Sequence, residues 1–195
     1  ASITDAVQIN AEYDPDRVNL DVDYRTRGDL GLLNIETDHH GRNVDTDDNQ
    51  LDLTLSDKLP TELRLEMGAC KSDLELGGIP LTLVDLEIGA ASGIISFSKP
   101  NPVRMRRMNI DVGASSARLY KLGNANVVKM KCDVGAASSH LDFSGEYHGE
   151  TEVDISVGVA SADIVLPKDV PVRIESDDDG WFSSVKFRKR GLDEV

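Results

Sequence analysis

A unit of about 22 residues recurs five times between residues 61 and 166, and this repetition constrains the fold more than any other feature of the sequence. Each copy holds an apolar residue, a glycine and then small residues, and the successive glycine spacings are 21, 24, 22 and 23. A unit this short cannot bury its own apolar side chains, so successive copies must stack on one another. The five glycines are Gly68, Gly89, Gly113, Gly135 and Gly158.

The residues before each glycine alternate between apolar and polar side chains. In the second unit, Val84, Leu86 and Ile88 enclose Asp85 and Glu87. Such alternation is typical of a β-strand with one buried face, and an apolar residue six positions after each glycine marks a second short strand. A helix is disfavoured, because an apolar period of two distributes the side chains around it. We therefore predict an all-β fold, a β-solenoid resembling a parallel β-helix, with about five coils and strand caps at both ends.

Each glycine is expected to lie at a bend between the two strands of its unit. Either the backbone there needs a positive φ, or a neighbouring layer comes too close for a Cβ atom, and both explanations stay open. Cys132 takes an inward strand position, and Cys70 takes a corner position. We predict that both are small buried fillers, three units apart and too distant for a disulfide.

The two ends of the chain differ from the repeats. Residues 1–60 are predicted to form an N-terminal strand cap or small subdomain, and residues 61–195 the solenoid with a C-terminal capping hairpin. The hairpin is expected to turn at residues 177–180, with Trp181 and Phe187 covering the last coil. The alternating runs behind these predictions are residues 18–24, 51–55 and 170–174.

The charge balance limits the classes of partner. The formal net charge is −14, with 35 acidic and 21 basic residues, which disfavours nucleic acid and favours cations or basic partners. No stretch approaches the roughly 18 apolar residues of a membrane span. The motifs of nucleophile elbows, phosphate loops, dinucleotide sites and zinc sites are absent, so we expect no cofactor and no enzymatic activity.

Stacking places equivalent residues above one another, and this predicts one notable surface feature. The residues two positions before each glycine form an outward column of carboxylates about 4.8 Å apart. Neighbouring carboxylates of this column repel one another by about 1 kcal/mol in water. A cation or a basic partner would relieve this repulsion. The alternative is an ordinary solvated face, screened by salt and compensated by Arg64 and Lys131. The predicted column consists of Glu66, Glu87, Asp111 and Asp133, and it ends at Ser156.

The histidines do not predict a metal site. His39 and His40 lie near Asp38 and Asp45, but adjacent side chains point in different directions and a third ligand is unassigned. We therefore interpret them as loop residues. The clusters of aspartates at residues 45–48 and 177–179 are explained by turn formation. His140 and His148 are placed on an outward strand position and in a turn.

The Gly-Ala-small repeat, together with the segment Leu166-Pro167-Lys168-Asp169-Val170-Pro171-Val172, resembles the bacterial toast-rack domains. That family is related to the C-terminal domain of cell-wall-active antibiotics response proteins and to adhesin-type domains. The likeness covers roughly residues 60–187, and residues 1–60 look like the N-terminal extension of the family. It implies a β-solenoid-like fold and a cell-envelope or extracytoplasmic setting, and it brings no catalytic residues.

Three functions remain open at this stage. The first is a non-catalytic cell-envelope or secreted domain, a rigid adhesin-like or sensory scaffold that binds a protein or an envelope glycan. The second is a carbohydrate-active enzyme with paired carboxylates of perturbed pKa in an elongated cleft. The low aromatic content of 5% disfavours it, since few rings are available to stack on sugars. The third is a spacer between other domains, and the oligomeric state is left open.

Overall fold

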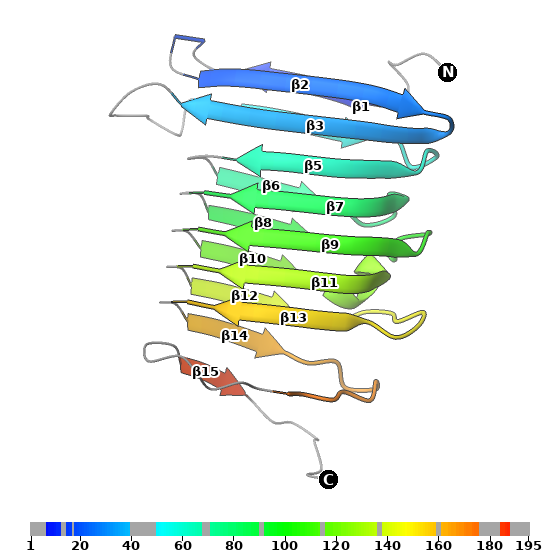
Figure 1. Ribbon diagram of the computed structural model, residues 1–195, viewed down its shortest axis with the longest axis vertical. Helices are drawn as coiled ribbons and strands as arrows, with labels where there is room; N and C mark the ends of the chain where they lie inside the picture. The colour runs from blue at the N-terminus through cyan, green and yellow to red at the C-terminus, as the bar shows by residue number, and fades with distance from the viewer. Residues whose placement is uncertain are drawn as a thin grey trace.

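The protein is built from strands that stack in two parallel columns along its long axis (Figure 1). In the computed structural model, the described part of the chain contains fifteen strands, one short 3-10 helix and no α-helix. The described residues are 7–12, 15–16, 18–39, 50–67, 71–89, 92–113, 116–135, 138–158, 161–175 and 184–187.

A seven-stranded sheet forms one side of the molecule, in the order β13-β11-β9-β7-β5-β3-β2. All neighbours from β3 to β13 run parallel, and β2 runs antiparallel to β3. The strands are β2 (Val18–Arg27), β3 (Leu30–His39), β5 (Thr61–Met67), β7 (Leu81–Ile88), β9 (Met105–Val112), β11 (Val127–Val134) and β13 (Glu152–Val157).

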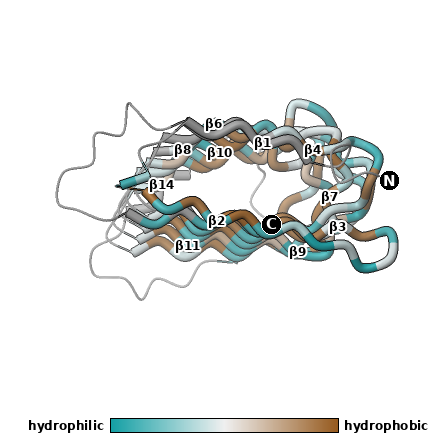
Figure 2. Tube along the Cα trace, turned by 90° about the horizontal axis from the view of Figure 1, so that it is seen from above, coloured by the Kyte–Doolittle hydropathy of each residue, from teal (hydrophilic) through white to brown (hydrophobic). Residues whose placement is uncertain are grey.

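A six-stranded parallel sheet forms the other side, in the order β15-β14-β12-β10-β8-β6. Its strands are β6 (Lys71–Glu75), β8 (Ser92–Ser96), β10 (Ser116–Tyr120), β12 (Ser138–Asp142), β14 (Ser161–Val165) and β15 (Ser184–Phe187). The antiparallel pair β1 (Val7–Glu12) and β4 (Gln50–Leu55) lies on the same side as this sheet (Figure 2).

The chain winds alternately between the two sheets, which confirms the predicted β-solenoid. From β5 to β13 it makes four complete turns, each passing through one strand of either sheet. The fifth pair, β13 and β14, does not return to the seven-stranded sheet, because β14 is followed by β15 in its own sheet. The number of turns is therefore about four, slightly lower than the five coils expected.

The core fills the space between the sheets, where the apolar side chains meet (Figure 2). The residues that precede the repeat glycines form one continuous column, since Ile88 pairs with Val112 and Val112 with Val134. These three side chains are at most 2% exposed. Full burial of a Val or Ile side chain stabilises the fold by about 1.5–3 kcal/mol. The inward Cys132 is free and 1% exposed, which confirms its predicted role as a buried filler.

At Gly113 and Gly135, close stacking and not a positive φ favours glycine. A Cβ atom on Gly113 would lie 3.3 Å from the carbonyl oxygen of Gly89, and one on Gly135 would lie 3.3 Å from that of Gly113. Neither glycine is among those with positive φ. The amide of Gly113 donates to the Ile88 oxygen at 2.9 Å, which holds the two layers together at this bend. Cys70, at the first bend, lies outside the described residues.

The opposite corner of the solenoid contains buried asparagines that the repeat did not predict. Asn124 belongs to a short 3-10 helix, η3 (Leu122–Ala125), Asn126 follows this helix directly, and the amide of Asn101 donates to the Asn124 oxygen. All three are at most 8% exposed. The side-chain nitrogen of Asn124 donates to the Phe97 oxygen at 2.8 Å. Apart from Leu81, which begins β7, the residues whose carbonyls accept from these amides lie outside the strands, where the chain passes between layers.

At the N-terminal end, a hairpin of β2 and β3 turns at Gly28, whose φ of 65° suits glycine. β3 pairs in parallel with β5, so the segment before the repeats contributes strands to the same sheet as the repeats. The proposed division between residues 1–60 and 61–195 stays a prediction.

The C-terminal end differs from the expected hairpin. Residues 166–175 form no strand, and β15 lies parallel to β14 instead of antiparallel to a preceding strand. β15 continues the stacking of the repeat, because Phe187 pairs with Ile164 in the register of the earlier layers. Residues 177–180 and Trp181 lie outside the described residues.

Candidate interaction surface

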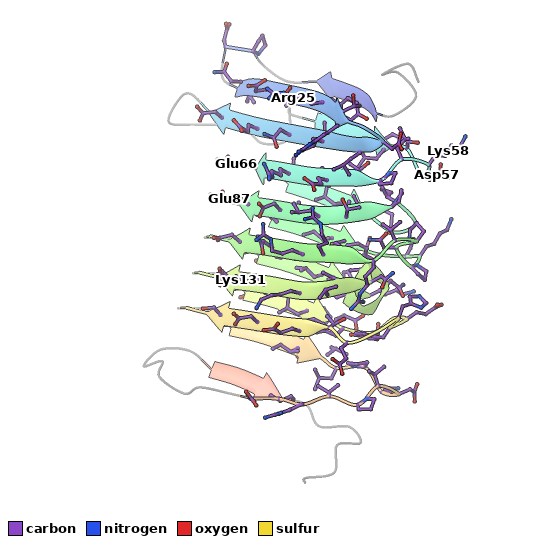
Figure 3. The ribbon with its side chains drawn as sticks, turned by 45° about the vertical axis from the view of Figure 1, so that its right-hand side comes forward. Arg25, Asp57, Lys58, Glu66, Glu87 and Lys131 are labelled. Carbon is purple, nitrogen blue, oxygen red and sulfur yellow. The ribbon has the colours of Figure 1, made fainter. Side chains whose placement is uncertain are left out.

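The four predicted carboxylates come together on the outer face of the seven-stranded sheet. Glu66 pairs with Glu87, Glu87 with Asp111, and Asp111 with Asp133. Ser156 follows as the last member of the column. Figure 3 shows Glu66 and Glu87 near the ends of neighbouring strands.

The column continues into the N-terminal hairpin, which the repeat alone did not predict. Glu36 on β3 pairs with Glu66, and Asp21 on β2 pairs with Glu36. The hairpin lacks the glycine of the repeats, but the alternation around Ile35 and Glu36 matches that around Leu65 and Glu66. This match was the signal that could have revealed the extension. We call the complete column the acidic ladder: Asp21, Glu36, Glu66, Glu87, Asp111 and Asp133.

Alternation along each strand explains why the ladder points to solvent. The residues on either side of Glu87 and Asp111 face the core: Leu86 and Ile88 lie around Glu87, and Ile110 and Val112 lie around Asp111. Successive side chains of a strand point to opposite faces of the sheet. All members of the ladder are exposed except Asp133, which is half-buried.

Most of the ladder is not neutralised by neighbouring side chains. Lys131 forms an ion pair with Asp133. Among the described residues, the other five carboxylates take part in no hydrogen bond or ion pair. Elsewhere on the same face, Glu62 and Glu152 are both paired with cations. Each adjacent pair from Asp21 to Asp111 therefore keeps its repulsion of about 1 kcal/mol in water.

The surroundings of Lys131 reflect the negative potential of this face. Its hydrogen bond to Asp133, the charge of Asp133, and the charges of Asp154 and Asp111 raise the pKa of the Lys131 amine. The amine is thus held in its cationic form. Because the Lys131 side chain is exposed, we take this as evidence of the sign of the local potential and not as a measure of stability.

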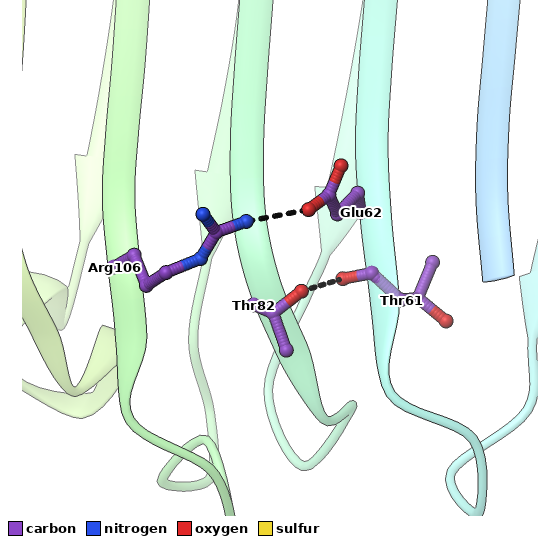
Figure 4. A network of polar contacts seen from close by, with 4 residues as sticks. All are labelled: Thr61, Glu62, Thr82 and Arg106. Atoms are coloured by element: carbon purple, nitrogen blue, oxygen red, sulfur yellow. Dashed lines mark hydrogen bonds and ion pairs between the residues drawn. The ribbon is translucent and has the colours of Figure 1, made fainter. Parts of the chain in front are cut away.

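Cationic side chains gather near the beginnings of β9 and β11 on the same face. Arg106 and Arg107 are successive exposed residues of β9, and Lys129 lies beside Arg107 in register. Arg106 reaches across β7 to Glu62, with 2.5 Å between nitrogen and oxygen, while Thr82 of β7 donates to the Thr61 oxygen (Figure 4). The face thus carries cations toward the strand beginnings and the acidic ladder toward the strand ends.

The opposite face carries a histidine whose partner the sequence did not reveal. Nδ1 of His140 lies 3.2 Å from Oδ2 of Asp163, and the rings of His140 and Tyr120 are 5.5 Å apart. Both His140 and Asp163 stand five positions after their repeat glycine, and this shared spacing was the available signal. Among the residues that the structure describes, no group of three or more His, Cys, Asp or Glu is arranged to hold a metal ion.

The other predicted polar clusters could not be placed. His40, Asp45 and the acidic cluster at residues 177–179 lie outside the described residues, and so does the side chain of His39. Within the described ranges, no helix has the length and apolar character of a membrane span.

Two stacked parallel sheets, closed by glycine bends and bearing charged columns outside, define a β-solenoid scaffold. The family described as the N-terminal domain of toast_rack, DUF2154, matches residues 1–105 and again residues 103–165. Because these matches cover most of the chain, the protein belongs to the toast_rack family. The match begins at residue 1, so it includes the N-terminal hairpin and not only the repeats. No curated protein and no solved structure matches the chain.

Proposed function

We propose that this domain is a rigid, non-catalytic scaffold of the bacterial cell envelope, which binds another macromolecule through the outer face of its seven-stranded sheet. The observation that carries the proposal is the acidic ladder, in which five carboxylates stacked in register form no hydrogen bond or ion pair with the described residues. A basic partner would relieve their mutual repulsion without any rearrangement of the sheet, since the strands already hold the side chains in place.

The family supports the extracytoplasmic part of the proposal. We expect toast-rack domains in the cell envelope, as the resemblance in the sequence implies, and a stacked fold provides the stiffness that an adhesin-like or sensory scaffold needs. The partner is then a protein or an envelope glycan with basic groups on its surface.

The test measures how two variants of the chain bind to immobilised envelope proteins and glycans, and compares them with the unmodified chain. The first neutralises the ladder with Glu66→Gln, Glu87→Gln and Asp111→Asn. The second is a matched control that neutralises three exposed acidic residues away from this face, Asp73, Glu146 and Asp169. We expect the ladder variant to lose binding and the control to retain it. Equal binding by both variants, or none by the unmodified chain, contradicts the proposal.

The same variants address the alternative of a carbohydrate-active enzyme. Strand spacing of about 4.8 Å is close to the carboxyl separation of retaining glycosidases, about 5–5.5 Å, but such enzymes also need a carboxyl group with a raised pKa. Glu75 shows the opposite behaviour: partial burial raises its pKa, but hydrogen bonds from Ser98, Ser96 and Gly77 outweigh that effect and lower it. We expect no release of reducing sugar from neutral or acidic polysaccharides, and release that Glu66→Gln abolishes would favour the enzyme.

A further inference from the structure

We propose that the open edge of β13, on the side away from β11, is a docking site for an extended segment of another protein. The segment adds one parallel strand to the end of the seven-stranded sheet. This site lies at the end of the stack and not on the outer face, so it is additional to the surface of the proposed function. The segment that fits alternates apolar residues with basic ones.

The backbone of β13 has hydrogen-bonding groups directed away from the sheet. β13 is the last strand of the seven-stranded sheet and pairs with β11 alone among the described strands. The amide of Gly158 donates to the Val134 oxygen at 2.8 Å, and the backbone groups of alternate residues point to opposite edges of a strand. The N–H and C=O groups of Val153, Ile155 and Val157 therefore point to the open edge. Such an edge is a template for pairing with another chain.

The side chains at this edge leave part of the core uncovered. Ile155 is half-buried, whereas Cys132, its partner on β11, is 1% exposed. The same difference separates Val153 from Met130. β11 has a strand on both sides, and β13 has one on a single side. A further strand with inward apolar side chains would complete this burial, which favours its binding.

The end of the molecule forms a step that is one strand wide. The six-stranded sheet continues one layer further than the seven-stranded sheet, because β15 pairs with β14 while no described strand pairs with β13 on that side (Figure 1). A second copy of the chain is two sheets wide, so it would contact β15 before one of its strands reached β13. A single extended segment has no second sheet. The step therefore favours a peptide segment over a second copy.

The segment of the chain that follows β14 is a poor occupant of this edge. Residues 166–175 form no strand; Figure 1 draws them as coil below β13, and no backbone hydrogen bond joins the two. In the repeats, the donors to the preceding layer alternate with the inward residues, as Gly158 shows. If Val170 and Val172 faced the core, the donor between them would be Pro171, which has no N–H group. A partner without proline at that position binds better.

The outward side chains of β13 determine the charge of the partner. Glu152 and Asp154 are exposed, and β11 already places Lys129 and Lys131 opposite them. The Lys129 nitrogen lies 3.0 Å from a Glu152 oxygen. Asp154 forms no hydrogen bond or ion pair in the described part of the chain. β11 thus shows the pattern that β13 accepts, and a partner with lysines at the same positions would pair with Asp154 from the open side.

A synthetic peptide with the sequence of β11 is the probe for this site. It comprises residues 127–134 with Cys132→Ser, and fluorescence polarisation measures its binding to the full chain. Methylation of its backbone nitrogens distinguishes strand addition from other contacts. Methyl groups on the residues equivalent to Lys129 and Lys131 remove the donors that face β13, so the dissociation constant should rise by about tenfold or more. Methyl groups on those equivalent to Met130 and Cys132 face away and should leave it nearly unchanged.

Amide hydrogen exchange locates the contact on the protein. In the free chain the amides of Val153, Ile155 and Val157 should exchange rapidly, and the peptide should protect them. The amide of Asp154 points to β11 and is the reference, since it should be protected in both states. Protection of the three amides without peptide overturns the proposal. If that protection grows with protein concentration, the edge binds a second copy; if it does not, the edge binds the chain's own segment.

A charge exchange provides the matching test on the protein. Asp154→Lys should weaken binding of the lysine peptide about fivefold, and a peptide with glutamate in place of both lysines should bind this variant better than it binds the unmodified chain. Asp73→Lys is the matched control, because Asp73 is exposed on β6 of the other sheet, and it should leave binding unchanged. Equal effects of the two substitutions overturn the assigned position of the peptide.

The ladder variant separates this site from the proposed function. With Glu66→Gln, Glu87→Gln and Asp111→Asn, the chain should bind the peptide within about twofold of the unmodified chain at moderate salt, where distant charges are screened. Loss of peptide binding in this variant, equal weakening by both methylation patterns, or no binding of the unmethylated peptide overturns the edge site. The proposed function would stand in each case, because it depends on how the same variant binds envelope proteins and glycans.

Discussion

The side-chain nitrogen of Asn126 donates to the backbone oxygen of Asn101 at 3.1 Å, and the Asn101 side chain donates in turn to the Leu81 oxygen at 2.8 Å. Asn101 also donates to the Ala125 oxygen, at 3.2 Å. Two buried amides thus connect three successive layers at the corner where the chain has no strand pairing.

Asn101→Ala is expected to lower the free energy of unfolding by about 1–3 kcal/mol, because it leaves the buried Leu81 and Ala125 carbonyls without that donor. Urea denaturation measures the change. Asn34→Ala is the control: Asn34 is half-exposed on β3, and we expect a change within about 0.5 kcal/mol. Similar losses from the two substitutions would mean that the buried amides have no special role.

Gly77→Ala is expected to be more damaging than a substitution at a glycine with open surroundings. A Cβ atom on Gly77 would lie 2.5 Å from the Lys99 amide nitrogen and 2.7 Å from that of Ser98, and backbone atoms cannot move aside cheaply. We expect a loss of more than about 2 kcal/mol in thermal or urea unfolding. Gly28→Ala meets nothing within 4 Å and costs only the strain of its positive φ, about 1–2 kcal/mol. The reverse order would contradict this account of the corner.

Glu75 should make stability depend on pH in the acid range. Its carboxylate accepts hydrogen bonds from the amides of Ser98 and Gly77 at 2.9 and 2.7 Å and from the Ser96 hydroxyl at 2.8 Å, and its net pKa falls below 4.5. Since the folded pKa is lowered, the stabilisation is present above about pH 4.5 and is lost as the pH falls through the folded pKa.

Melting temperatures measured across the acid range should therefore fall less steeply for Glu75→Gln than for the unmodified chain. Asp73→Asn, at an exposed position of the same strand, serves as the control and should leave the slope unchanged. An identical acid slope in all three proteins would show that the Glu75 hydrogen bonds are not formed in solution.

Cys132 should be inert while the protein is folded. Burial, followed by the charges of Asp133 and Asp111, raises the pKa of the Cys132 thiol to about 12. In a Cys70→Ser background, a thiol reagent at neutral pH should react only after denaturant is added. Because the folded pKa is raised, this thiol also favours folding below about pH 9 and loses that effect as the pH rises toward 12. Rapid labelling of the folded chain would contradict the buried position.

The fold was predictable because the stacking of short units leaves few arrangements. Alternation before the glycines predicted the buried column through Ile88 and Val112, and also the outward column through Glu87 and Asp111. The role of the glycines was not predictable, because a positive φ and a close neighbour both favour the same residue. The structure separates the two explanations, because Gly113 has no positive φ and lies close to Gly89.

The parts that escaped prediction lack the repeat or depend on contacts distant in sequence. Glu36 joins the ladder through pairing with β5, a relationship that no glycine marks. The asparagine corner depends on carbonyls of the preceding layers, as Asn124 does on that of Phe97. At the C-terminus, local turn signals favoured a hairpin, but β15 pairs in parallel with β14. Stacking on an existing layer prevails there over the local signal.

The antiparallel pairing of β2 with β3 limits where a repeat can be added to the stack. The parallel winding does not continue past this hairpin, so another coil of the same kind cannot be added beyond β2 and fits instead among the parallel strands. Duplicating one repeat would extend the body by a single strand spacing, about 4.8 Å, and would leave the coils at both ends with the neighbours they already have. The length of the domain can therefore change in steps of one coil, by duplication of a repeat, while both ends of the stack stay the same.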